Sequence, residues 1–433
     1  MANRVDTSEV GSTGLNIWYG MVEERYISDL YGTEGIAVFD EMRRRDPSLR
    51  TLLYVTKIMA RQSDWTVAAA SEEAVDQVPA EFLEECLDDM SHTVNDAVDD
   101  FLSMLWAGWS WHEICYKRRE GAAGDHLSKF DDGRVGWRKW AARRQTSFYK
   151  WEIDAAGGLQ GLWQWPLAGR VSSEATLIPI EKSLHFTTES DGGNPEGISL
   201  FESAYEHWYF LKNLLPLMGI GFERSFVGLP VFEFEEKPSS TDKGAVAAMG
   251  KGLRMGEKAY ASLPPGVKMK LETVQNSVGG SILAVIQYFR LLLLQSALAE
   301  FVGIGTGGGA QSLAAHQDKT GLFLMAVNGW LSKIETVLNR FAVPRLFEYN
   351  TFPGMTALPR IQHSEVMKTD LGALGDFVSA IAPHIPLVDE DVAWVRTQAG
   401  MPAVEAGGVS GLQITQAQAD LDALKGVLGA GAE

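Results

Sequence analysis

Two apolar stretches decide how the rest of the chain is interpreted: ISLFESAYEHWYFLKNLLPLMGIGFERSF at Ile198–Phe226 and SILAVIQYFRLLLLQSALAEFV at Ser281–Val302. Their apolar content and length predict two long helices. Between them, the β-prone runs VGLPVFEFEEK and PPGVKMKLETV flank a short helical segment rich in Ala, Gly, Met and Lys. The second stretch runs into the glycine-rich sequence GIGTGGGAQ. The expected plan is two long helices joined by a small α/β insert, with a flexible loop after the second helix.

Pro216 lies inside the first stretch. A proline in a helix interior removes a backbone hydrogen bond and costs about 3 kcal/mol unless the helix bends there. Two interpretations follow. Either the helix bends at Pro216, or it begins after Pro216 and Ile198–Leu215 belongs to the preceding domain.

The composition is that of an acidic globular protein. A chain of 433 residues is long enough for two or three domains, and its 45% hydrophobic and 22% charged residues are ordinary. The net charge of −18 argues against a protein that binds nucleic acid by neutralising phosphates. It fits a surface that does not adhere to DNA, and equally a protein that is merely soluble.

The cysteine count and the length of the apolar windows indicate where in the cell the protein is assembled. Cys86 and Cys115 are too few for a disulfide framework or a zinc site, so we expect free thiols and assembly in the cytosol. The N-terminus lacks the apolar run of a signal peptide. Charges at Lys212, Arg290 and Glu300 interrupt the apolar windows before they reach the roughly 20 residues of a membrane helix. We therefore expect a soluble protein without a membrane partner.

The N-terminal third predicts a loose polar arm followed by helices. Residues 1–20 are polar, and residues 31–61 predict two helices around Asp46–Pro47, because Pro is favoured at a helix start. The alternation in SDWTVAAAS predicts a strand, and Pro79–Met104 predicts one further helix.

The middle of the chain predicts strands and the end predicts helices. Aromatic and β-branched runs indicate strands, namely WSWHEICYK, TSFYKWEID, GLWQWPL and LIPIEKSLHFTTE. Lys319–Phe341 predicts a long helix that ends at Val343–Pro344, and FPGMTALPRIQH is expected to be extended. Three helices are expected after Ser364, in TDLGALGDFVSAIA, DEDVAWVRTQAG and QAQADLDALKGVL.

Three motifs suggest chemistry only weakly. His112–Glu113 begins like a zinc-protease motif, but Tyr116 stands where the second histidine belongs, and the segment predicts a strand. GIGTGGGAQS lacks the Gly-Lys-Ser/Thr ending of a phosphate loop and follows a helix instead of a strand, so a mobile loop is the better interpretation. Lys117–Arg144 is basic and contains Trp137 and Trp140, as single-strand binding surfaces do. The alternative is a hairpin loop solvated by its charges or docked on an acidic neighbouring subunit.

The 13 tryptophans raise one enzymatic alternative: a monomeric, aromatic-rich hydrolase acting on polysaccharide with paired carboxylates. No carboxylate pair lies in a recognisable strand-end setting, and most tryptophans occur at core periodicity.

Beyond these motifs, an ordered series of segments resembles the portal proteins of tailed bacteriophages, in the branch that includes the Mu-like portals. The series consists of LYGTEGIAVFDEMRRRDPSLRTLLYVTKIMARQSDWTV, IPIEKSLHFTTESDGGNPEGISLFESAYEHWYFLKN, GFERSFVGLPVFEF, the glycine loop, and the helix ending in LNRFAVPRLFEYN. The resemblance covers roughly residues 30–350. The C-terminal helices match only in character.

The resemblance implies an α+β portal fold assembled as a ring, usually of twelve subunits. Carried onto this sequence, it divides the chain into a flexible arm (1–30), an α/β wing (31–197), the first stem helix (198–226), a small α/β clip (227–280), the second stem helix (281–302), a tunnel loop (303–318), a wing return (319–360) and a helical crown with tail (361–433).

The resemblance also implies a non-enzymatic function with no catalytic residue, metal or cofactor. The ring would stand at one vertex of the virion capsid after assembly in the host cytoplasm. Double-stranded DNA would be pumped in and later leave through it without sequence recognition. Its implied partners are the terminase large subunit, the major capsid or scaffold protein and head-completion or adaptor proteins.

Two sets of site residues follow from the resemblance. The tunnel loop facing DNA would contain Gly303, Gly305, Thr306, Gly307, Gly308, Gly309, Gln311 and Ser312, with His316 and Lys319 as the nearest candidates for charge. The basic residues of the clip that would dock partners are Lys243, Lys251, Arg254, Lys258, Lys268 and Lys270.

Two features of the residues agree with a ring through which DNA slides. Long apolar helices in so small a segment need neighbouring subunits to bury them. A tunnel loop without cations does not hold phosphates, and each phosphate neutralised would add salt-dependent affinity and therefore drag. A further alternative is another ring of the same virion, such as a connector or baseplate component, which would lack a clip that binds a terminase.

Overall fold

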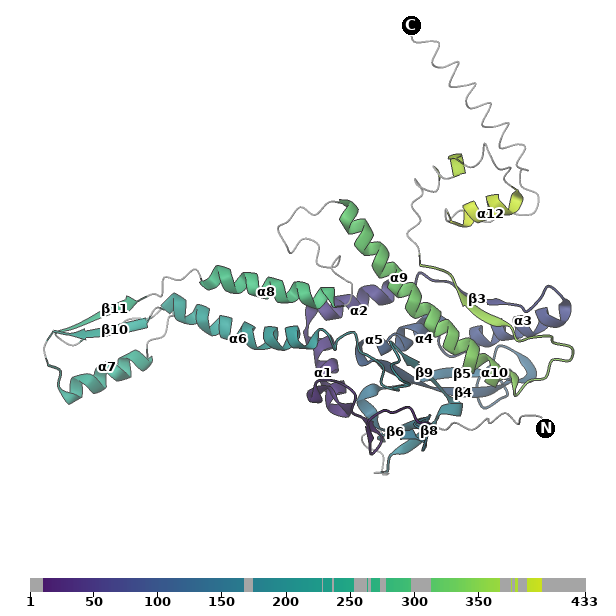
Figure 1. Ribbon diagram of the computed structural model, residues 1–433, viewed down its shortest axis with the longest axis horizontal. Helices are drawn as coiled ribbons and strands as arrows, with labels where there is room; N and C mark the ends of the chain where they lie inside the picture. Colours follow the sequence, from purple (N-terminus) through teal and green to yellow (C-terminus); the bar gives the residue numbers. More distant parts are fainter. Residues whose placement is uncertain are drawn as a thin grey trace, which may run out of the picture. The chain divides into compact units, whose positions relative to one another are not determined.

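The computed structural model describes residues 11–166, 174–227, 229–235, 237–252, 263, 266–272, 278–296, 313–366, 375, 378–380 and 388–398 (Figure 1). The chain divides into two compact units, Met1–Val366 and Met367–Glu433. In the second unit, helix α12 (Asp389–Gln398) confirms one of the three helices expected there. The helix expected at 369–382 lies largely outside the described residues, and the last lies wholly outside them.

The first two helices, α1 (Gly32–Arg45) and α2 (Pro47–Ala60), confirm the prediction around Asp46–Pro47. The Asp46 carboxylate accepts hydrogen bonds from the backbone N–H groups of Ser48 and Leu49 at 2.9 and 3.0 Å. Pro47 occupies the first helical turn, where its missing N–H costs nothing. This one dipeptide therefore ends α1 and starts α2.

The single helix expected at Pro79–Met104 is wrong. The segment instead contains α3 (Ala74–Asp88), α4 (Val94–Phe101) and α5 (Met104–Ala107). Pro79 lies inside α3 and does not start it. The break before α4 is a capping box, in which Thr93 Oγ1 accepts from the Asp96 N–H at 3.1 Å and the Asp96 carboxylate accepts from the Thr93 N–H at 3.2 Å. Such local polar bonds interrupt a helical pattern that hydrophobic spacing alone would continue.

Two three-stranded antiparallel sheets follow. In the first, β4 (Trp109–Glu120) pairs with β5 (Asp131–Arg143) on one side and with β9 (Ser183–Thr187) on the other. In the second, β7 (Leu159–Gln164) pairs with β6 (Phe148–Ile153) and β8 (Thr176–Pro179). Strand β3 (Trp65–Ala68) pairs with β12 (Arg360–His363), close to the end of the first unit. The strands expected in this region are confirmed, whereas β5 is a strand where a hairpin loop was expected.

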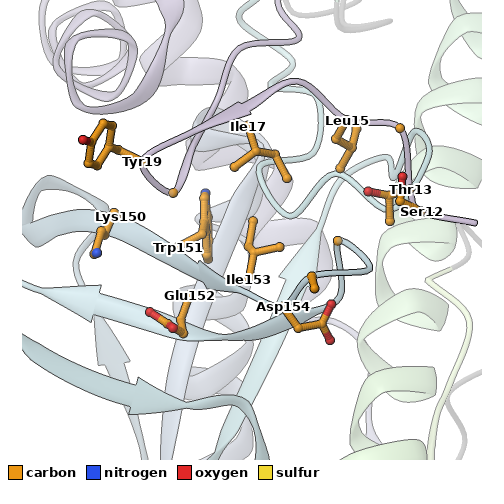
Figure 2. A pocket seen from close by; sticks show the side chains of 14 residues that line it. Ser12, Thr13, Leu15, Ile17, Tyr19, Lys150, Trp151, Glu152, Ile153 and Asp154 are labelled. Atoms are coloured by element: carbon orange, nitrogen blue, oxygen red, sulfur yellow. The ribbon is translucent and has the colours of Figure 1, made fainter.

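The N-terminal arm is not loose from Thr13 onward. It forms the small hairpin β1 (Ile17–Trp18) and β2 (Met21–Val22) and lies along β6 (Figure 2). The Thr13 N–H donates to the carbonyl of Ala156 at 3.1 Å, and the Trp151 N–H donates to the carbonyl of Gly20 at 2.8 Å.

Two apolar clusters form the core of the first unit. The first lies among α2, α3, α4, β4, β5, β9 and α9, and its largest buried rings are Phe82, Phe101, Trp137, Trp140, Phe186 and Phe323. The second lies among α1, β4, the second sheet and the base of α6, and its largest buried rings are Phe39, Trp109, Trp111, Phe148, Trp151 and Phe201. Most tryptophans are thus core residues, as their spacing predicted.

The two long helices are α6 (Tyr205–Val227) and α8 (Val278–Gln295), which lie side by side (Figure 1). Between them, β10 (Leu229–Phe234) pairs with β11 (Val267–Glu272), and helix α7 (Ser240–Gly252) joins the strands, which confirms the α/β insert. Helix α6 runs through Pro216, so the interpretation in which the helix begins after the proline is wrong. The helix begins at Tyr205 and not at Ile198. The turns that precede α6 are hydrogen-bonded to α5, because the Leu200 N–H donates to the Leu105 carbonyl at 2.9 Å.

Helix α9 (Leu313–Val337) continues through a π-helical turn (Leu338–Ala342) into α10 (Val343–Phe347). Val343–Pro344 therefore does not end the helical segment as expected, because Pro344 stands in the first turn of α10, where no N–H is needed. At the π turn, the Asn339 amide donates to the Ile361 carbonyl at 2.7 Å and accepts from its N–H at 2.8 Å. This pair of bonds holds β12 against the π-helical turn.

Candidate functional site

The candidate site is the hairpin of helices α6 and α8, because its faces differ sharply in exposure. One face is buried at Trp208, Leu211, Ile286 and Leu293. The other presents large apolar side chains to solvent, namely Tyr209, Phe210, Leu215, Leu217, Ile220, Leu283, Val285, Tyr288 and Leu291. Polar side chains would be expected on a face that stays in water, so this surface indicates an interface. No helix in the described part of the chain is long and apolar enough to cross a membrane.

The base of α6 is anchored to the N-terminal segment by polar contacts. Lys212 donates to Glu41 of α1 at 2.9 Å, and the Tyr205 hydroxyl donates to Asp29 at 3.4 Å. Arg25 forms an ion pair with Glu202 at 3.5 Å, just before the helix. These contacts all lie before Pro216 and fix the first turns of α6 to the N-terminal segment.

Arg25 is the centre of a buried charge cluster. Its guanidinium donates to the Leu30 carbonyl at 2.5 Å, lies over the Phe39 ring and pairs with Glu196 at 3.6 Å as well as with Glu202. Two carboxylates thus share one guanidinium. Burial raises the pKa of Glu196 although Arg25 and a hydrogen bond from Trp151 oppose the shift, and burial likewise raises the pKa of Glu202. Sequence spacing gave no signal for this cluster, because its members lie far apart in the chain.

The basic residues predicted to dock partners lie on the α/β insert, but only part of the set is described. Lys268 pairs with Glu235 at 2.5 Å, and Lys270 pairs with Glu233 at 2.9 Å across the β10–β11 hairpin. Lys243 is exposed on α7. Lys251 lies at the end of α7, and Arg254 and Lys258 lie outside the described residues. The two hairpin lysines are therefore largely neutralised by their own strand partners.

The predicted tunnel loop lies outside the described residues, from Gly303 to Ser312. The two nearest candidates for charge, His316 and Lys319, lie in the first turns of α9. The described residues resume only at α9, so the assignment of Gly303–Ser312 to a tunnel loop stays a prediction.

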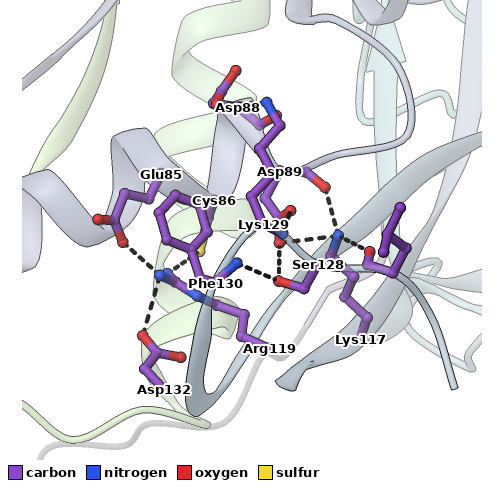
Figure 3. Close-up of polar contacts among 11 residues, drawn as sticks. Glu85, Cys86, Asp88, Asp89, Lys117, Arg119, Ser128, Lys129, Phe130 and Asp132 are labelled. Atoms are coloured by element: carbon purple, nitrogen blue, oxygen red, sulfur yellow. Dashed lines mark hydrogen bonds and ion pairs between the residues drawn. The ribbon is translucent and has the colours of Figure 1, made fainter. Parts of the chain in front are cut away.

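The basic stretch at 117–144 pairs with an acidic helix of the same chain. Figure 3 shows two clusters that join the β4–β5 hairpin to the end of α3. In one, the buried Asp89 carboxylate accepts from the Lys117 ammonium at 2.9 Å, the Ser128 hydroxyl at 2.7 Å and the Lys129 N–H at 2.8 Å. Burial alone would raise the pKa of Asp89, but these donors lower it.

In the other cluster, the buried Arg119 pairs with Glu85 at 2.5 Å and with Asp132 at 3.1 Å (Figure 3). Its guanidinium also lies over the Phe130 ring, 4.1 Å from the centroid. Trp137 and Trp140, the two rings that suggested nucleic-acid stacking, are buried. Buried rings cannot stack on bases, so the two tryptophans do not form a single-strand binding surface. The end of α3 is the acidic partner of Lys117, Arg119 and Lys129.

The zinc-protease motif is excluded by geometry. His112 is fully buried in β4 between the Phe101 and Phe186 rings, and burial lowers its pKa to about 3. Glu113 instead forms an ion pair with Arg143. Within the described ranges, no group of three or more His, Cys, Asp or Glu side chains is arranged to hold a metal.

Comparison with known proteins assigns the family. The family described as the portal protein of Mu bacteriophage matches residues 36–401. No curated protein sequence matches the chain. Among solved structures, a chain from the virion of a native gene transfer agent particle is similar with a TM-score of 0.54 and 10% identity, covering 88% of this chain and 95% of that chain. A chain from the neck of the empty particle is similar with a TM-score of 0.53 and 11% identity, covering 88% and 95%.

The fold is thus shared with chains from the virion and from the neck of gene transfer agent particles. Since the match spans most of its length, the chain belongs to the family of the Mu bacteriophage portal protein. The predicted resemblance is confirmed, together with the mixed helix and sheet fold, the portal function and the virion location that the family carries. The alternative of a polysaccharide hydrolase is not supported.

Proposed function

We propose that the chain forms a closed homo-oligomeric ring of twelve subunits at one capsid vertex, and that the ring acts as a non-enzymatic channel for double-stranded DNA. The observation that carries the proposal is the exposed apolar face of α6 and α8 in a chain of the portal family. A ring buries the same face in every subunit through one repeated head-to-tail contact, which an isolated chain cannot do.

Within that ring, α6 and α8 are the stem helices around the channel, and residues 303–312 form the tunnel loop. That loop contains no charged residue, so it would guide DNA sterically without binding phosphates. The net charge of −18 also disfavours binding of the DNA phosphates. Movement would be driven by a separate ATPase, the terminase large subunit.

The α/β insert is the proposed clip that docks the terminase during packaging and the head-completion or adaptor proteins afterwards. Lys268 and Lys270 pair with glutamates on β10 and the residue after it, which lowers their contribution to docking. The other residues of the proposed docking set are Lys243, Lys251, Arg254 and Lys258. The wing would contact the major capsid or scaffold protein.

Deletion of Gly305–Gly309 tests the channel role separately from assembly. We expect rings of normal mass and shape by native mass spectrometry and negative-stain imaging, with DNA packaging or retention abolished. The matched control deletes five residues from the tail, Gly429–Glu433, and should leave packaging unchanged. Disrupted rings after the loop deletion, or unimpaired packaging, would count against the proposal.

A further inference from the structure

The N-terminal segment connects the second sheet to the root of helix α6. Its first half lies along β6 and is hydrogen-bonded to it (Figure 2). Its second half reaches the turns before α6, where Arg25 pairs with Glu202 at 3.5 Å and Asp29 accepts from the Tyr205 hydroxyl at 3.4 Å. Residues 13–30 are called here the strap. A movement of the strap therefore changes how the root of α6 is held.

The contact between the strap and the root of α6 contains two carboxylates and one guanidinium, called here the latch. The Arg25 side chain, which is 7% exposed, lies 3.6 Å from Glu196 and 3.5 Å from Glu202. With both carboxylates ionised, the latch carries one uncompensated negative charge that is largely removed from water. Because burial of an unpaired charge is unfavourable, the two carboxylates retain one proton between them. Burial accordingly raises the pKa of Glu196 and the pKa of Glu202.

The groups packed around the latch supply no further positive charge in the described part of the chain. The charges that act on the two carboxylates are those of Arg25 and of each other. His185 of β9 donates to the Pro195 carbonyl at 2.8 Å, next to Glu196, and burial lowers its pKa to about 4, so its ring is neutral above that pH. The neutral groups that contact the latch are the Trp151 indole N–H and the Val22 N–H, which donate to Glu196, the Leu30 carbonyl, which accepts from Arg25, and the Phe39 ring.

The two carboxylates differ in how firmly they are held. The Glu196 side chain is 4% exposed and accepts hydrogen bonds from Trp151 and from the Val22 N–H. The Glu202 side chain is 24% exposed, and its Oε2 and the Arg25 Nε have no hydrogen-bond partner although they lie 3.5 Å apart. The ion pair thus holds Glu202 without a hydrogen bond. When both carboxylates are ionised, Glu202 is therefore the one that turns toward water.

The backbone of Glu202 belongs to the turns that lead into α6. Its N–H donates to the Ser199 carbonyl at 3.1 Å, and its carbonyl accepts from the Tyr205 N–H at 3.3 Å. Departure of Glu202 from the latch therefore loosens these turns and frees the second half of the strap. The strands of the first sheet keep their own ladders and are not affected.

We propose that the latch of Arg25, Glu196 and Glu202 is a pH-sensitive switch that sets how firmly the strap holds the root of α6. While the two carboxylates share one proton, the latch is closed. When that proton is lost, Glu202 leaves Arg25, and the strap and the root of α6 open locally. Because the closed latch binds the proton more tightly than the open one, a rise in pH favours opening. The switch belongs to a single chain and does not depend on the ring.

Hydrogen exchange of the purified full chain, followed by mass spectrometry, tests the switch. Rates at about pH 5 and about pH 8 are compared after correction for the intrinsic pH dependence of exchange. We expect residues 201–212 and 13–25 to exchange about threefold or more faster at the higher pH, because local opening exposes their N–H groups. Residues 131–143 of β5, which do not contact the latch, should exchange at the same corrected rate at both pH values.

Glutamine variants assign the effect to the latch. Glu202→Gln keeps the shape of the side chain and leaves one carboxylate for one guanidinium, so the difference between the two pH values should disappear at residues 201–212. Glu196→Gln leaves the same charge balance and should give the same result, so the test stands if one of the two variants does not fold. The matched control is Glu206→Gln, which removes an exposed carboxylate of the first turn of α6 and should keep the pH dependence of the parent chain.

Three results would overturn the proposal. One is equal corrected exchange of residues 201–212 at both pH values in the parent chain. Another is a pH dependence that persists in the folded glutamine variants of the latch. The third is an equal acceleration in β5, which would indicate a global loss of stability in place of a local switch. Native mass spectra of the same samples measure ring formation separately, so an absence of rings would count against the proposed function and not against the latch.

Discussion

The two three-stranded sheets with their helices, which belong to the region that we propose as the wing, differ from the α6–α8 hairpin in where their side chains find partners. In the first sheet, basic residues of β4 and of the β4–β5 hairpin pair with carboxylates of α3, and Trp137 and Trp140 are buried within the chain. In the helical hairpin, one face packs on the wing and the other exposes large apolar side chains. A mutation in the wing should therefore act on the folding of one chain, and a mutation on the outer face of the hairpin should act on assembly.

The largest effect is expected from a core ring of the wing. Trp137→Ala removes a fully buried side chain that contacts Trp140 and should lower the free energy of unfolding by about 3–5 kcal/mol. Chemical denaturation of the purified chain measures this loss. The matched control Trp18→Ala removes an exposed ring and should change stability by about 0.5 kcal/mol or less. Similar losses in both variants would contradict the assignment of Trp137 to the core.

The second-largest loss of stability is expected from breaking the buried ion pair between Asp89 and Lys117. Asp89→Ala leaves the Lys117 ammonium buried without its carboxylate, and we expect a loss of about 3–5 kcal/mol. Asp88→Ala, next to it but exposed, should cost roughly 1 kcal/mol or less. Thermal unfolding of the two variants compares them. Equal melting temperatures would show that the Asp89 cluster does not anchor the β4–β5 hairpin.

On the α6–α8 hairpin, Leu217→Asp should separate an effect on assembly from an effect on the folding of one chain. Leu217 is exposed in the isolated chain, so its replacement should change the stability of the wing by about 0.5 kcal/mol or less. In a ring, however, the new carboxylate would be buried in an apolar interface, and the ring population in native mass spectra should fall strongly. Leu217→Met is the conservative control. Intact rings in the Asp variant would place the subunit interface elsewhere.

The Arg25 cluster predicts a smaller, pH-dependent effect. Because the folded-state pKa of Glu196 lies above its ordinary value of 4.5, the free energy of unfolding falls as the pH rises through that folded-state pKa. Glu196→Gln has no proton to lose. Its stability relative to the parent chain should therefore increase from pH 5 toward pH 8, as followed by thermal unfolding. A pH-independent difference would contradict the shift, and Glu34→Gln, at an exposed position, is the control.

The smallest effect is expected at the partly exposed pair between Glu41 and Lys212. Breaking it with Lys212→Met should cost about 0.2–1 kcal/mol, because water screens both partners. Exchanging the two charges, with Glu41→Lys and Lys212→Glu together, should recover part of that loss. A double-mutant cycle by denaturation gives the coupling free energy. No recovery would mean that the pair does not position α6.

Much of the fold could be predicted from local signals. Asp46–Pro47 marked the boundary between α1 and α2, and alternating aromatic runs marked the strands of both sheets. The errors occurred where local bonds override periodicity. The Thr93–Asp96 capping box divides the helix expected at 79–104, and the π turn carries α9 past the position where Val343–Pro344 was expected to end it.

The site was predicted less completely than the fold. The stretch at 117–144 has the composition of a nucleic-acid surface, yet its Trp137 and Trp140 are buried, and Lys117 and Arg119 pair with Asp89 and Glu85 at the end of α3. Composition reports which charges a segment carries and cannot report which charges face them. The exposure of Trp18 and Trp165 was also missed, because the sequence does not distinguish these tryptophans from buried ones such as Trp151.

The sequence by itself determined the elements, the two long apolar helices with their α/β insert, and the family, since these depend on residue order and spacing along the chain. The tertiary structure alone decided which charges pair, where α6 begins and which aromatic rings remain in solvent. Those properties depend on contacts between residues tens or hundreds of positions apart, such as Arg25 with Glu196 and Asn350 with Val135. Local pattern carries no information about such contacts until the chain has folded.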